Sequence, residues 1–305
     1  MSLVELALKK MQSAAQNSPR KPETRTPHEP DPARANVVGE VVHRTSHRPI
    51  ESNEVVAASD KLVHVDPQAL RAAGLAPPEH QQRELADQYR NIKRPLVGAA
   101  IGRGTRRLDR GQLIMLASAM PGEGKTFTSI NLALSMAKEK DISVLLVDAD
   151  VAKPHISNTF GVAREPGLLD VLHDPTSNVE SFILQTDVPN LSILPAGTRS
   201  EMATELLASL RMEETVNYLA QSNPNRIVLI DSPPLLMTSE SRALAHWVGQ
   251  IVVVVRAGFT PHRAVLDAIS QLENEKSISL VLNQSKFTST PYYYGYGESG
   301  PDPAA

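Results

Sequence analysis

The sequence lacks cysteine and has no long apolar run. The absence of Cys among the 305 residues excludes disulfide scaffolds, thiolate metal sites and thiol nucleophiles. Residues 251–255 form one of the longest apolar runs, far below the roughly 20 residues that span a bilayer. A net charge of −3 provides no overall basic field, so we expect no nucleic-acid partner. A soluble cytoplasmic protein is therefore the expectation.

Aromatic residues are also scarce, and their distribution divides the chain. None of the 12 aromatic residues (five Phe, one Trp, six Tyr) precedes Tyr89, whereas 9 of the 23 prolines lie within residues 1–80. A segment without aromatic residues cannot bury enough apolar surface to offset the entropy of ordering it. We therefore predict a disordered, proline-rich leader over residues 1–80, a folded domain over 81–290 and a flexible tyrosine-rich tail over 291–305.

Within the predicted domain, apolar runs alternate with helical patterns. The first helix is expected over 79–94, because Pro95 disfavours helical geometry in the residue before it. Strands are predicted at 113–116, 143–147, 191–194, 226–230, 250–255 and 279–282, and the intervening helices at 126–140, 201–210, 212–222, 240–245 and 261–273. Strands that are apolar throughout and separated by helices predict an α/β fold, a mostly parallel sheet with helices on both faces.

A glycine-containing loop follows the first predicted strand. Its sequence, ASAMPGEGKT over residues 117–126, links that strand to a predicted helix, which is the context of a phosphate-binding loop. We expect Lys125 to bridge the terminal phosphates and Thr126 to ligate Mg²⁺. The first glycine of the usual pattern is replaced by Ala119, and simple turn glycines are the alternative. The loop residues predicted to contact the nucleotide are Pro121, Gly122, Glu123, Gly124, Lys125, Thr126 and Phe127.

Acidic residues follow two further predicted strands. Asp148 and Asp150 come after the strand at 143–147, and Asp231 comes after the strand at 226–230. Open α/β sheets bind ligands at the carboxyl ends of their strands, and Mg²⁺ prefers a few carboxylates with phosphate oxygens. A single Asp there is often a helix cap or turn residue. Three such acids beside a phosphate loop predict instead ligands of Mg²⁺ and of its waters, and hence a nucleoside triphosphate site.

The segments PGEGKT, LLVDAD and IVLIDSPP resemble, in order and spacing, the Walker A, A′ and B motifs of bacterial protein-tyrosine autokinases (BY-kinases). These kinases are associated with capsule and exopolysaccharide export. The resemblance covers about residue 85 to the end and implies a P-loop NTPase-type fold with ATP and Mg²⁺ as cofactors. Residues 92–95 and 148–154 are most similar to the branch linked to exosortase-type loci, and the segments 194–197 and 205–207 also fit the family pattern.

The resemblance also implies roles for individual residues. Lys125, Asp148, Asp150 and Asp231 form the expected catalytic set, in which Asp148 assists deprotonation of the acceptor tyrosine and the other two acids organise the metal and its waters. Asn283 resembles the adenine-reading Asn of related ATPases, although a turn residue is the alternative. The family commonly has Arg after the A′ acids, whereas this chain has Ala152 and Lys153.

Four of the six tyrosines lie close together near the end of the chain. They are Tyr292, Tyr293, Tyr294 and Tyr296, next to Pro291 and followed by a segment rich in Gly and Pro. Adjacent glycine and proline disfavour a core strand here. We predict that the four tyrosines are phosphoacceptors that reach a neighbouring subunit. An exposed interaction motif is the alternative.

The resemblance further implies partners. Similar kinases pair with a membrane-spanning polysaccharide co-polymerase that activates them, so we expect recruitment of a cytoplasmic protein to the inner face of the plasma membrane. A homo-oligomer that phosphorylates in trans is also expected, although residues 87–93 depart from the family's Glu-x-x-Arg-x-x-Arg assembly pattern.

Two alternatives to a tyrosine autokinase remain at this point. One is a partner-regulated ATPase of the plasmid-partitioning or septum-positioning type. Those proteins usually carry a lysine five places before the loop lysine, where this chain has Met120, and they normally lack a tyrosine tail. The other is a nucleotide-binding scaffold without turnover, which motifs alone do not exclude.

Overall fold

The computed structural model describes residues 62–104, 106–272 and 276–285. Most of the predicted leader and the whole predicted tail, with its four acceptor tyrosines, lie outside these residues. No helix in the described ranges combines the length and the apolar character that crossing a bilayer requires.

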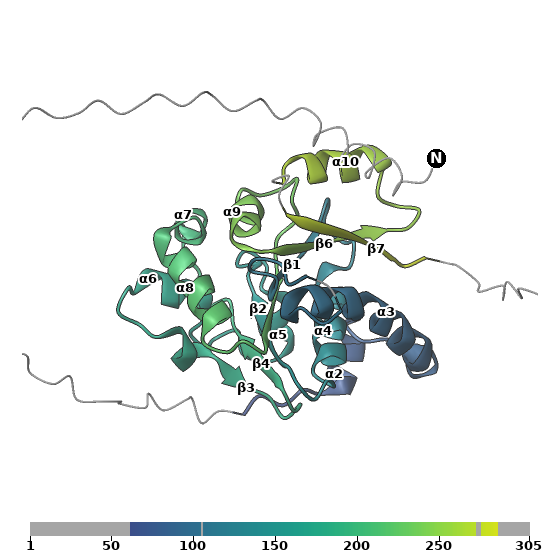
Figure 1. Ribbon diagram of the computed structural model, residues 1–305, viewed down its shortest axis with the longest axis horizontal. Helices are drawn as coiled ribbons and strands as arrows, with labels where there is room; N and C mark the ends of the chain where they lie inside the picture. Colours follow the sequence, from purple (N-terminus) through teal and green to yellow (C-terminus); the bar gives the residue numbers. More distant parts are fainter. Residues whose placement is uncertain (1–61, 105, 273–275, 286–305) are drawn as a thin grey trace, which may run out of the picture.

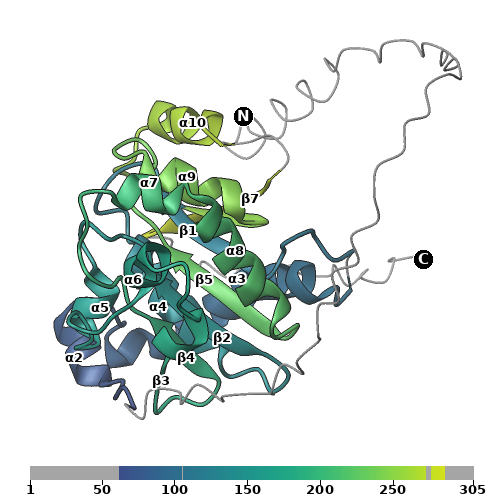
Figure 2. The ribbon, with the colours of Figure 1, turned by 90° about the vertical axis from the view of Figure 1, so that its left-hand side faces the viewer.

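One seven-stranded sheet forms the centre of the fold, in the order β3-β4-β2-β5-β1-β6-β7. Figure 2 shows this order running from β3 at one end of the molecule to β7 near the other. Its strands are β1 (Leu113–Ser118), β2 (Ser143–Asp148), β3 (Leu184–Gln185), β4 (Leu191–Leu194), β5 (Arg226–Asp231), β6 (Gln250–Arg256) and β7 (Ser277–Asn283). All neighbours pair in parallel except β3 and β4, so the predicted mostly parallel sheet is confirmed. The two-residue β3 is too short to have left a periodic signal.

Helices cover both faces of this sheet, as predicted (Figure 1). The α-helices are α2 (Pro67–Ala72), α3 (Gln82–Ile101), α4 (Lys125–Met136), α5 (His155–Thr159), α6 (Leu168–His173), α7 (Ala203–Leu207), α8 (Leu210–Gln221), α9 (Glu240–Trp247) and α10 (His262–Ser270), with 3₁₀ turns at Glu79–Gln81 and Val179–Phe182. Alternate residues of β1 serve the two faces: Leu113 and Met115 pack with α6 to α10, and Ile114 and Leu116 pack with α2 to α5. A strand buried on both faces needs this uninterrupted apolar run.

Helix α3 continues through Pro95, so the predicted helix end at residue 94 is wrong. Proline cannot donate to the carbonyl four residues earlier, and inside a helix it costs about 3 kcal/mol. Pro95 is exposed, while Leu96, Val97 and Ala100 are buried against the sheet. Their packing offsets the lost hydrogen bond, and the helix ends at Gly102, whose φ of 77° lies in the left-handed region.

The packed part of the chain begins before residue 81. Val63 and Leu70 are only 3% exposed, although both were assigned to the leader. The Val63 N–H donates to the Gln185 carbonyl at 2.8 Å, and the Asp187 N–H donates to the Val63 carbonyl at 3.1 Å. This segment therefore covers the short strand β3, and for residues 62–80 the predicted boundary lies too late. A few isolated apolar residues among prolines carried too little pattern to reveal it.

Candidate nucleotide-binding and catalytic site

The loop between β1 and α4 has the backbone of a phosphate-binding loop. Gly122 and Gly124 adopt φ values of 78° and 93°, a region that residues with a Cβ rarely enter. Gly124 lies immediately before α4, and a Cβ there would come within 2.0 Å of the Asn283 Nδ2. Ala119, the departure from the glycine pattern, is fully buried in the core. The loop geometry thus requires glycine at both positions. The loop leads into the N-terminus of the 12-residue helix α4, and anions bind favourably at such a helix end.

Glu123 holds this loop together from within. Its side chain is 1% exposed, and its Oε2 accepts the Met120 N–H at 2.7 Å. Its Oε1 accepts the hydroxyl of Thr260, which follows β6. The Glu123 side chain, predicted to contact the nucleotide, therefore uses both carboxylate oxygens in hydrogen bonds to the protein. Thr260 did not emerge from the sequence, because it is distant from the loop along the chain.

Asp231 is completely buried, and both of its oxygens are hydrogen-bonded. Thr126 Oγ1 donates to Oδ2 at 2.7 Å, and Ser129 Oγ donates to Oδ1 at 2.9 Å. Burial raises the pKa of Asp231, while the Lys125 charge and the two hydroxyl donors oppose this shift. Asp231 therefore anchors the first turn of α4 to the end of β5.

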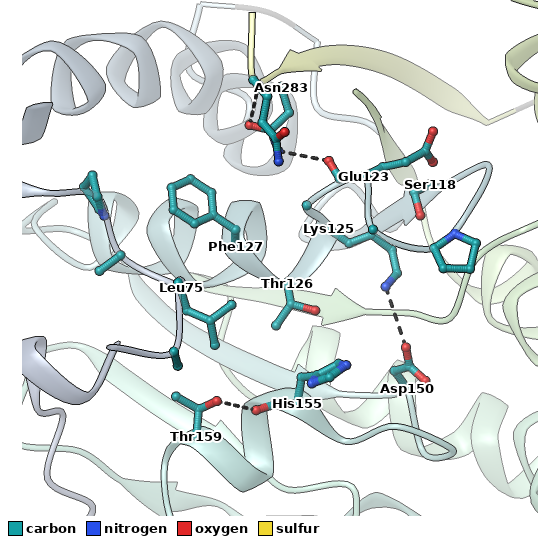
Figure 3. Close-up of a pocket in the computed structure, with 18 of the residues that line it drawn as sticks. Leu75, Ser118, Glu123, Lys125, Thr126, Phe127, Asp150, His155, Thr159 and Asn283 are labelled. Carbon is teal, nitrogen blue, oxygen red and sulfur yellow. Dashed lines mark hydrogen bonds and ion pairs between the residues drawn. The ribbon is translucent and has the colours of Figure 1, made fainter. Parts of the chain in front are cut away.

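Lys125 and Asp150 face each other across the mouth of the site, as Figure 3 shows. The Lys125 Nζ lies 3.6 Å from the Asp150 Oδ2, and both side chains are about nine-tenths buried. The other Asp150 oxygen accepts the Lys153 N–H at 3.2 Å. A lysine so placed, at the start of a phosphate loop, is suited to exchange its carboxylate partner for phosphate oxygens.

Asp148 pairs in register with Asp231 across β2 and β5 but has different surroundings. Its Oδ2 accepts the Ser157 N–H at 2.8 Å and the Ser157 hydroxyl at 2.7 Å. Its buried Oδ1 has no hydrogen-bond partner within the described residues. Burial raises the pKa of Asp148 to about 7, with further contributions from the charges of Asp231 and Asp150 against the opposing Ser157 hydrogen bonds. A carboxyl group that titrates near neutrality is suited to proton transfer.

Lys125, Thr126 and Asp150 line a cleft of about 1100 Å³. Phe127 and Thr126 lie in its middle in Figure 3, with Asn283 on one side and His155 and Thr159 of α5 on the other. Residues 73–78, from the segment before α3, also line the cleft, and Asn131 Nδ2 donates to the Leu75 carbonyl at 2.9 Å. The sequence had not indicated that this segment reaches the site.

Asn283 is the last residue of β7 and is tied to the phosphate loop. Its Nδ2 donates to the Glu123 carbonyl at 2.9 Å, and its own carbonyl accepts the Ala257 N–H at 2.9 Å. The structure thus brings together all the described residues of the predicted site. It also adds Ser157, Thr260 and residues 73–78, which sequence reasoning missed.

The donor chemistry of the site suits Mg²⁺ completed by phosphate oxygens. No group of three or more His, Cys, Asp or Glu side chains that could hold a metal occurs in the described part of the chain. The available oxygens near Lys125 come instead from Thr126, Asp150 and Asp231. Mg²⁺ binds in this way, through one or two carboxylates and the phosphates of its substrate, rather than in an all-protein cage.

Comparison with protein families and curated proteins gives concordant matches. A family described as "AAA domain" matches residues 111–281, more than half of the chain. EpsB of Ralstonia nicotianae, provisionally assigned as a tyrosine-protein kinase, is 35% identical over 188 residues, which are 61% of this chain and 24% of EpsB. Tyrosine-protein kinase YwqD of Bacillus subtilis is 29% identical over 214 residues, 70% of this chain and 86% of YwqD. This chain thus spans about a quarter of the length of EpsB.

Solved structures agree with this picture. The kinase domain of the Escherichia coli tyrosine kinase ETK superposes with a TM-score of 0.56 at 26% identity, over 69% of this chain and 80% of that domain. The BceF tyrosine kinase domain gives a TM-score of 0.57 at 27% identity, over 70% of this chain and 85% of that domain. The resemblance to bacterial tyrosine kinases and the expected P-loop NTPase-type fold are confirmed. The narrower exosortase-linked branch stays a prediction.

Proposed function

The chain belongs to the AAA domain family, and from this premise we propose that it is an ATP- and Mg²⁺-dependent protein-tyrosine kinase. The observation that carries the proposal is a buried carboxylate with one bare oxygen, Asp148 Oδ1, beside a complete phosphate loop. A nucleotide-binding site alone does not require such a group. The similarity to YwqD and to the ETK and BceF kinase domains supports the choice of tyrosine as acceptor.

Phosphate binding would use the loop and the start of α4. The backbone N–H groups after Gly122 and the positive end of the helix favour the negative charge of a triphosphate. Lys125, now 3.6 Å from Asp150, would contact the β- and γ-phosphates. Phe127 and Asn283 line the same cleft and would border the nucleoside. Glu123 keeps the loop in this shape through Met120 and Thr260.

Mg²⁺ would be held by Thr126 and Asp150, with Asp231 acting through the Thr126 hydroxyl that it accepts at 2.7 Å. When bound, the ion neutralises charge on the phosphate oxygens during transfer. Because the Thr126 hydrogen is directed to Asp231, the lone pairs of the Thr126 oxygen are left for the metal. Asp231 thereby fixes the orientation of a ligand rather than serving only as a ligand itself.

Proton transfer would fall to Asp148. The phenol has an ordinary pKa of about 10, so it needs an acceptor as it attacks. In the proposed step Asp148 takes the tyrosine proton, the phenolic oxygen forms a bond to the γ-phosphorus, and the bond from that phosphorus to the β–γ bridging oxygen breaks. The bond electrons leave with ADP, and the products are ADP and phosphotyrosine. Positioning and charge neutralisation supply most of the catalysis in such transfers.

The acceptors we propose are Tyr292, Tyr293, Tyr294 and Tyr296, reached in trans within a homo-oligomer. Each added phosphate contributes about −1.5 to −2 charge, which would be repelled by the acidic site and favour release. We further propose a role in exopolysaccharide synthesis or export. In this role a membrane-spanning co-polymerase activates the kinase at the inner face of the plasma membrane.

The proposal is tested with the purified full chain, ATP and Mg²⁺. Mass spectrometry should find phosphotyrosine on the peptide covering residues 286–305, lost in Lys125→Ala and retained in the control Lys138→Ala, which removes an exposed lysine after α4. Phosphate release without phosphotyrosine would contradict the kinase and favour the partner-regulated ATPase. If neither phosphotyrosine nor free phosphate forms, the chain would be a nucleotide-binding scaffold without turnover.

A further inference from the structure

We propose that Ser157, held by the segment 194–197, is a positioning residue that fixes the orientation of the Asp148 carboxylate and so leaves one of its oxygens unpaired. The inference rests on the proposed function and assigns a role to a serine and a loop that the mechanism above does not use. Ser157 lies on the short helix α5 and is 1% exposed, beside the fully buried Asp148. It would act through Asp148 without touching the substrate.

The direction of the Ser157 hydroxyl follows from its two neighbours. Its oxygen accepts the Ala196 N–H at 3.0 Å, and because an amide can only donate, the single hydroxyl hydrogen remains for Asp148 Oδ2 at 2.7 Å. The Ser157 N–H donates to the same oxygen at 2.8 Å. Among the described residues, two donors contact Oδ2 and none contacts Oδ1, and this asymmetry holds the carboxylate in one rotational state. Its unpaired oxygen then remains available for the proton of the acceptor.

The segment that supplies the Ala196 N–H is itself rigidly held. The Leu168 N–H donates to the Pro195 carbonyl at 2.8 Å, and the Leu169 N–H donates to the Ala196 carbonyl at 3.0 Å. These bonds place the amino terminus of α6 directly against the carboxyl end of β4. The peptide group that carries the Ala196 N–H and the next peptide group along the chain cannot rotate without breaking these bonds.

Two glycines make this close approach possible. A Cβ on Gly167 would lie 2.1 Å from the Pro195 carbonyl oxygen. Gly197 has a φ of 85°, and a Cβ there would lie 2.3 Å from Asp170 Oδ2. That oxygen accepts the Gly167 N–H at 2.8 Å and the Thr198 N–H at 2.9 Å, so Asp170 links the two backbone segments. The segment 194–197 thus forms a fixed support that reaches Asp148 through one serine hydroxyl.

The test compares Ser157→Ala, which removes the hydroxyl but keeps the backbone N–H, with Ser157→Thr, which keeps both donors. We expect kcat for tyrosine phosphorylation to fall about 10- to 100-fold in Ser157→Ala, the range for a small misplacement of a reacting group. The dissociation constant for Mg²⁺-ATP should remain within about twofold, because the hydrogen bonds of the Ser157 hydroxyl go to Asp148 and Ala196. Ser157→Thr should restore the rate. Thr215→Ala, which removes a buried hydroxyl bonded to the Arg211 carbonyl at 2.7 Å in α8, is the matched control.

A double variant separates positioning from general damage. If Ser157 acts through Asp148, Ser157→Ala should cause no further loss in an Asp148→Asn background. A full additional loss there, or a parallel loss of nucleotide affinity, would overturn the inference while leaving the kinase activity of the unaltered chain in place.

Crystal structures of the variants supply a readout that needs no turnover. We expect the carboxylate of Asp148 to rotate in Ser157→Ala and to keep its orientation in Ser157→Thr. An unchanged carboxylate in Ser157→Ala overturns the positioning role. If the unaltered chain forms no phosphotyrosine, the proposed function fails, and these structures still decide whether Ser157 orients Asp148.

Discussion

Two aspartates occupy equivalent positions in the sheet and differ in almost everything else. Asp148 ends β2, Asp231 ends β5, and the two are paired in register on adjacent parallel strands. Both are fully buried. Within the part of the chain that the structure describes, Asp231 has a hydroxyl donor on each oxygen, whereas Asp148 has two donors on one oxygen and none on the other. Equal burial therefore does not imply an equal role.

The difference shows that the hydrogen bonds of a buried carboxylate indicate whether its role is structural or chemical. A buried carboxylate that accepts a hydrogen bond on each oxygen stabilises its donors, and the donors in turn favour its ionised form. A buried carboxylate with a bare oxygen bears a desolvation cost that the fold does not recover, which is a common feature of functional sites. We expect Asp231 to shape the phosphate loop and Asp148 to take part in the chemistry.

The largest expected effect comes from Asp148→Asn. The amide oxygen can still accept from Ser157, so the fold should be retained, but the site loses its proton acceptor. We expect kcat for tyrosine phosphorylation to fall about 10²- to 10⁴-fold, the usual contribution of a general base, with nucleotide affinity little changed. Single-turnover phosphorylation and equilibrium nucleotide titration measure the two quantities. A variant with near-normal kcat would remove the distinction between the two acids.

The same substitution should change how stability depends on pH. The pKa of Asp148 is raised to about 7 in the folded chain, from 3.8, so the folded state binds the proton more tightly. The folded chain therefore loses stability as pH rises from about 4 to about 7, and it regains none above that.

Asp148→Asn lacks this loss, so the variant should gain stability over the unaltered chain across that window, by at most about 4 kcal/mol at 1.36 kcal/mol per pKa unit. Urea unfolding at pH 4.5, 6 and 8, in EDTA without nucleotide, measures the difference. If the difference in free energy of unfolding between the variant and the unaltered chain does not vary with pH, ionising the buried Asp148 does not destabilise the folded chain.

Substitution of Asp231 should mainly weaken the binding of nucleotide with Mg²⁺. Asp231→Ala removes the acceptor of the Thr126 hydroxyl and frees the Thr126 side chain to rotate, whereas the Ser129 hydroxyl keeps the Lys125 carbonyl as an acceptor. We expect Mg²⁺-dependent nucleotide affinity to fall about 10- to 100-fold, as for other residues that orient a metal ligand. Calorimetric titration with and without Mg²⁺ separates this loss from phosphate binding. A selective loss of kcat with intact affinity would instead place Asp231 in the same class as Asp148.

A smaller change should make Asp231 resemble Asp148. Ser129→Ala removes the donor to Asp231 Oδ1 and leaves that buried oxygen unpaired. The free energy of unfolding should fall by about 1–3 kcal/mol, the cost of an unsatisfied buried polar group. Ser270→Ala is a matched control, because its hydroxyl donates to the Asp267 carbonyl on the surface of α10. Equal stability of the two variants would mean that the Ser129 contact adds little to the anchor.

Much of the fold and part of the candidate site could be predicted because the signals are local. The loop from Pro121 to Thr126 is contiguous, and Asp148, Asp150 and Asp231 each end a recognisable apolar run. Ser157 and Thr260 left no such signal, since a single serine or threonine in a loop has many possible roles. The segment 62–78 is predicted as part of the leader because its few buried residues are separated by polar ones. Its position depends on contacts with distant residues, such as the Val63–Thr186 bridge and the hydrogen bond from Asn131 to the Leu75 carbonyl.

By itself, then, the sequence determined the parallel sheet, the phosphate loop and the edge at which the acids meet, because apolar periodicity and short contiguous motifs are properties of neighbouring residues. The tertiary structure alone decided which acid has both oxygens hydrogen-bonded and which has one unpaired oxygen among the described residues. Thr126 and Asp231 are 105 residues apart, and Ser157 and Ala196 are 39 apart. Hydrogen-bond donors from such distant segments meet a carboxylate only after the strands have packed, and they set its pKa and orientation.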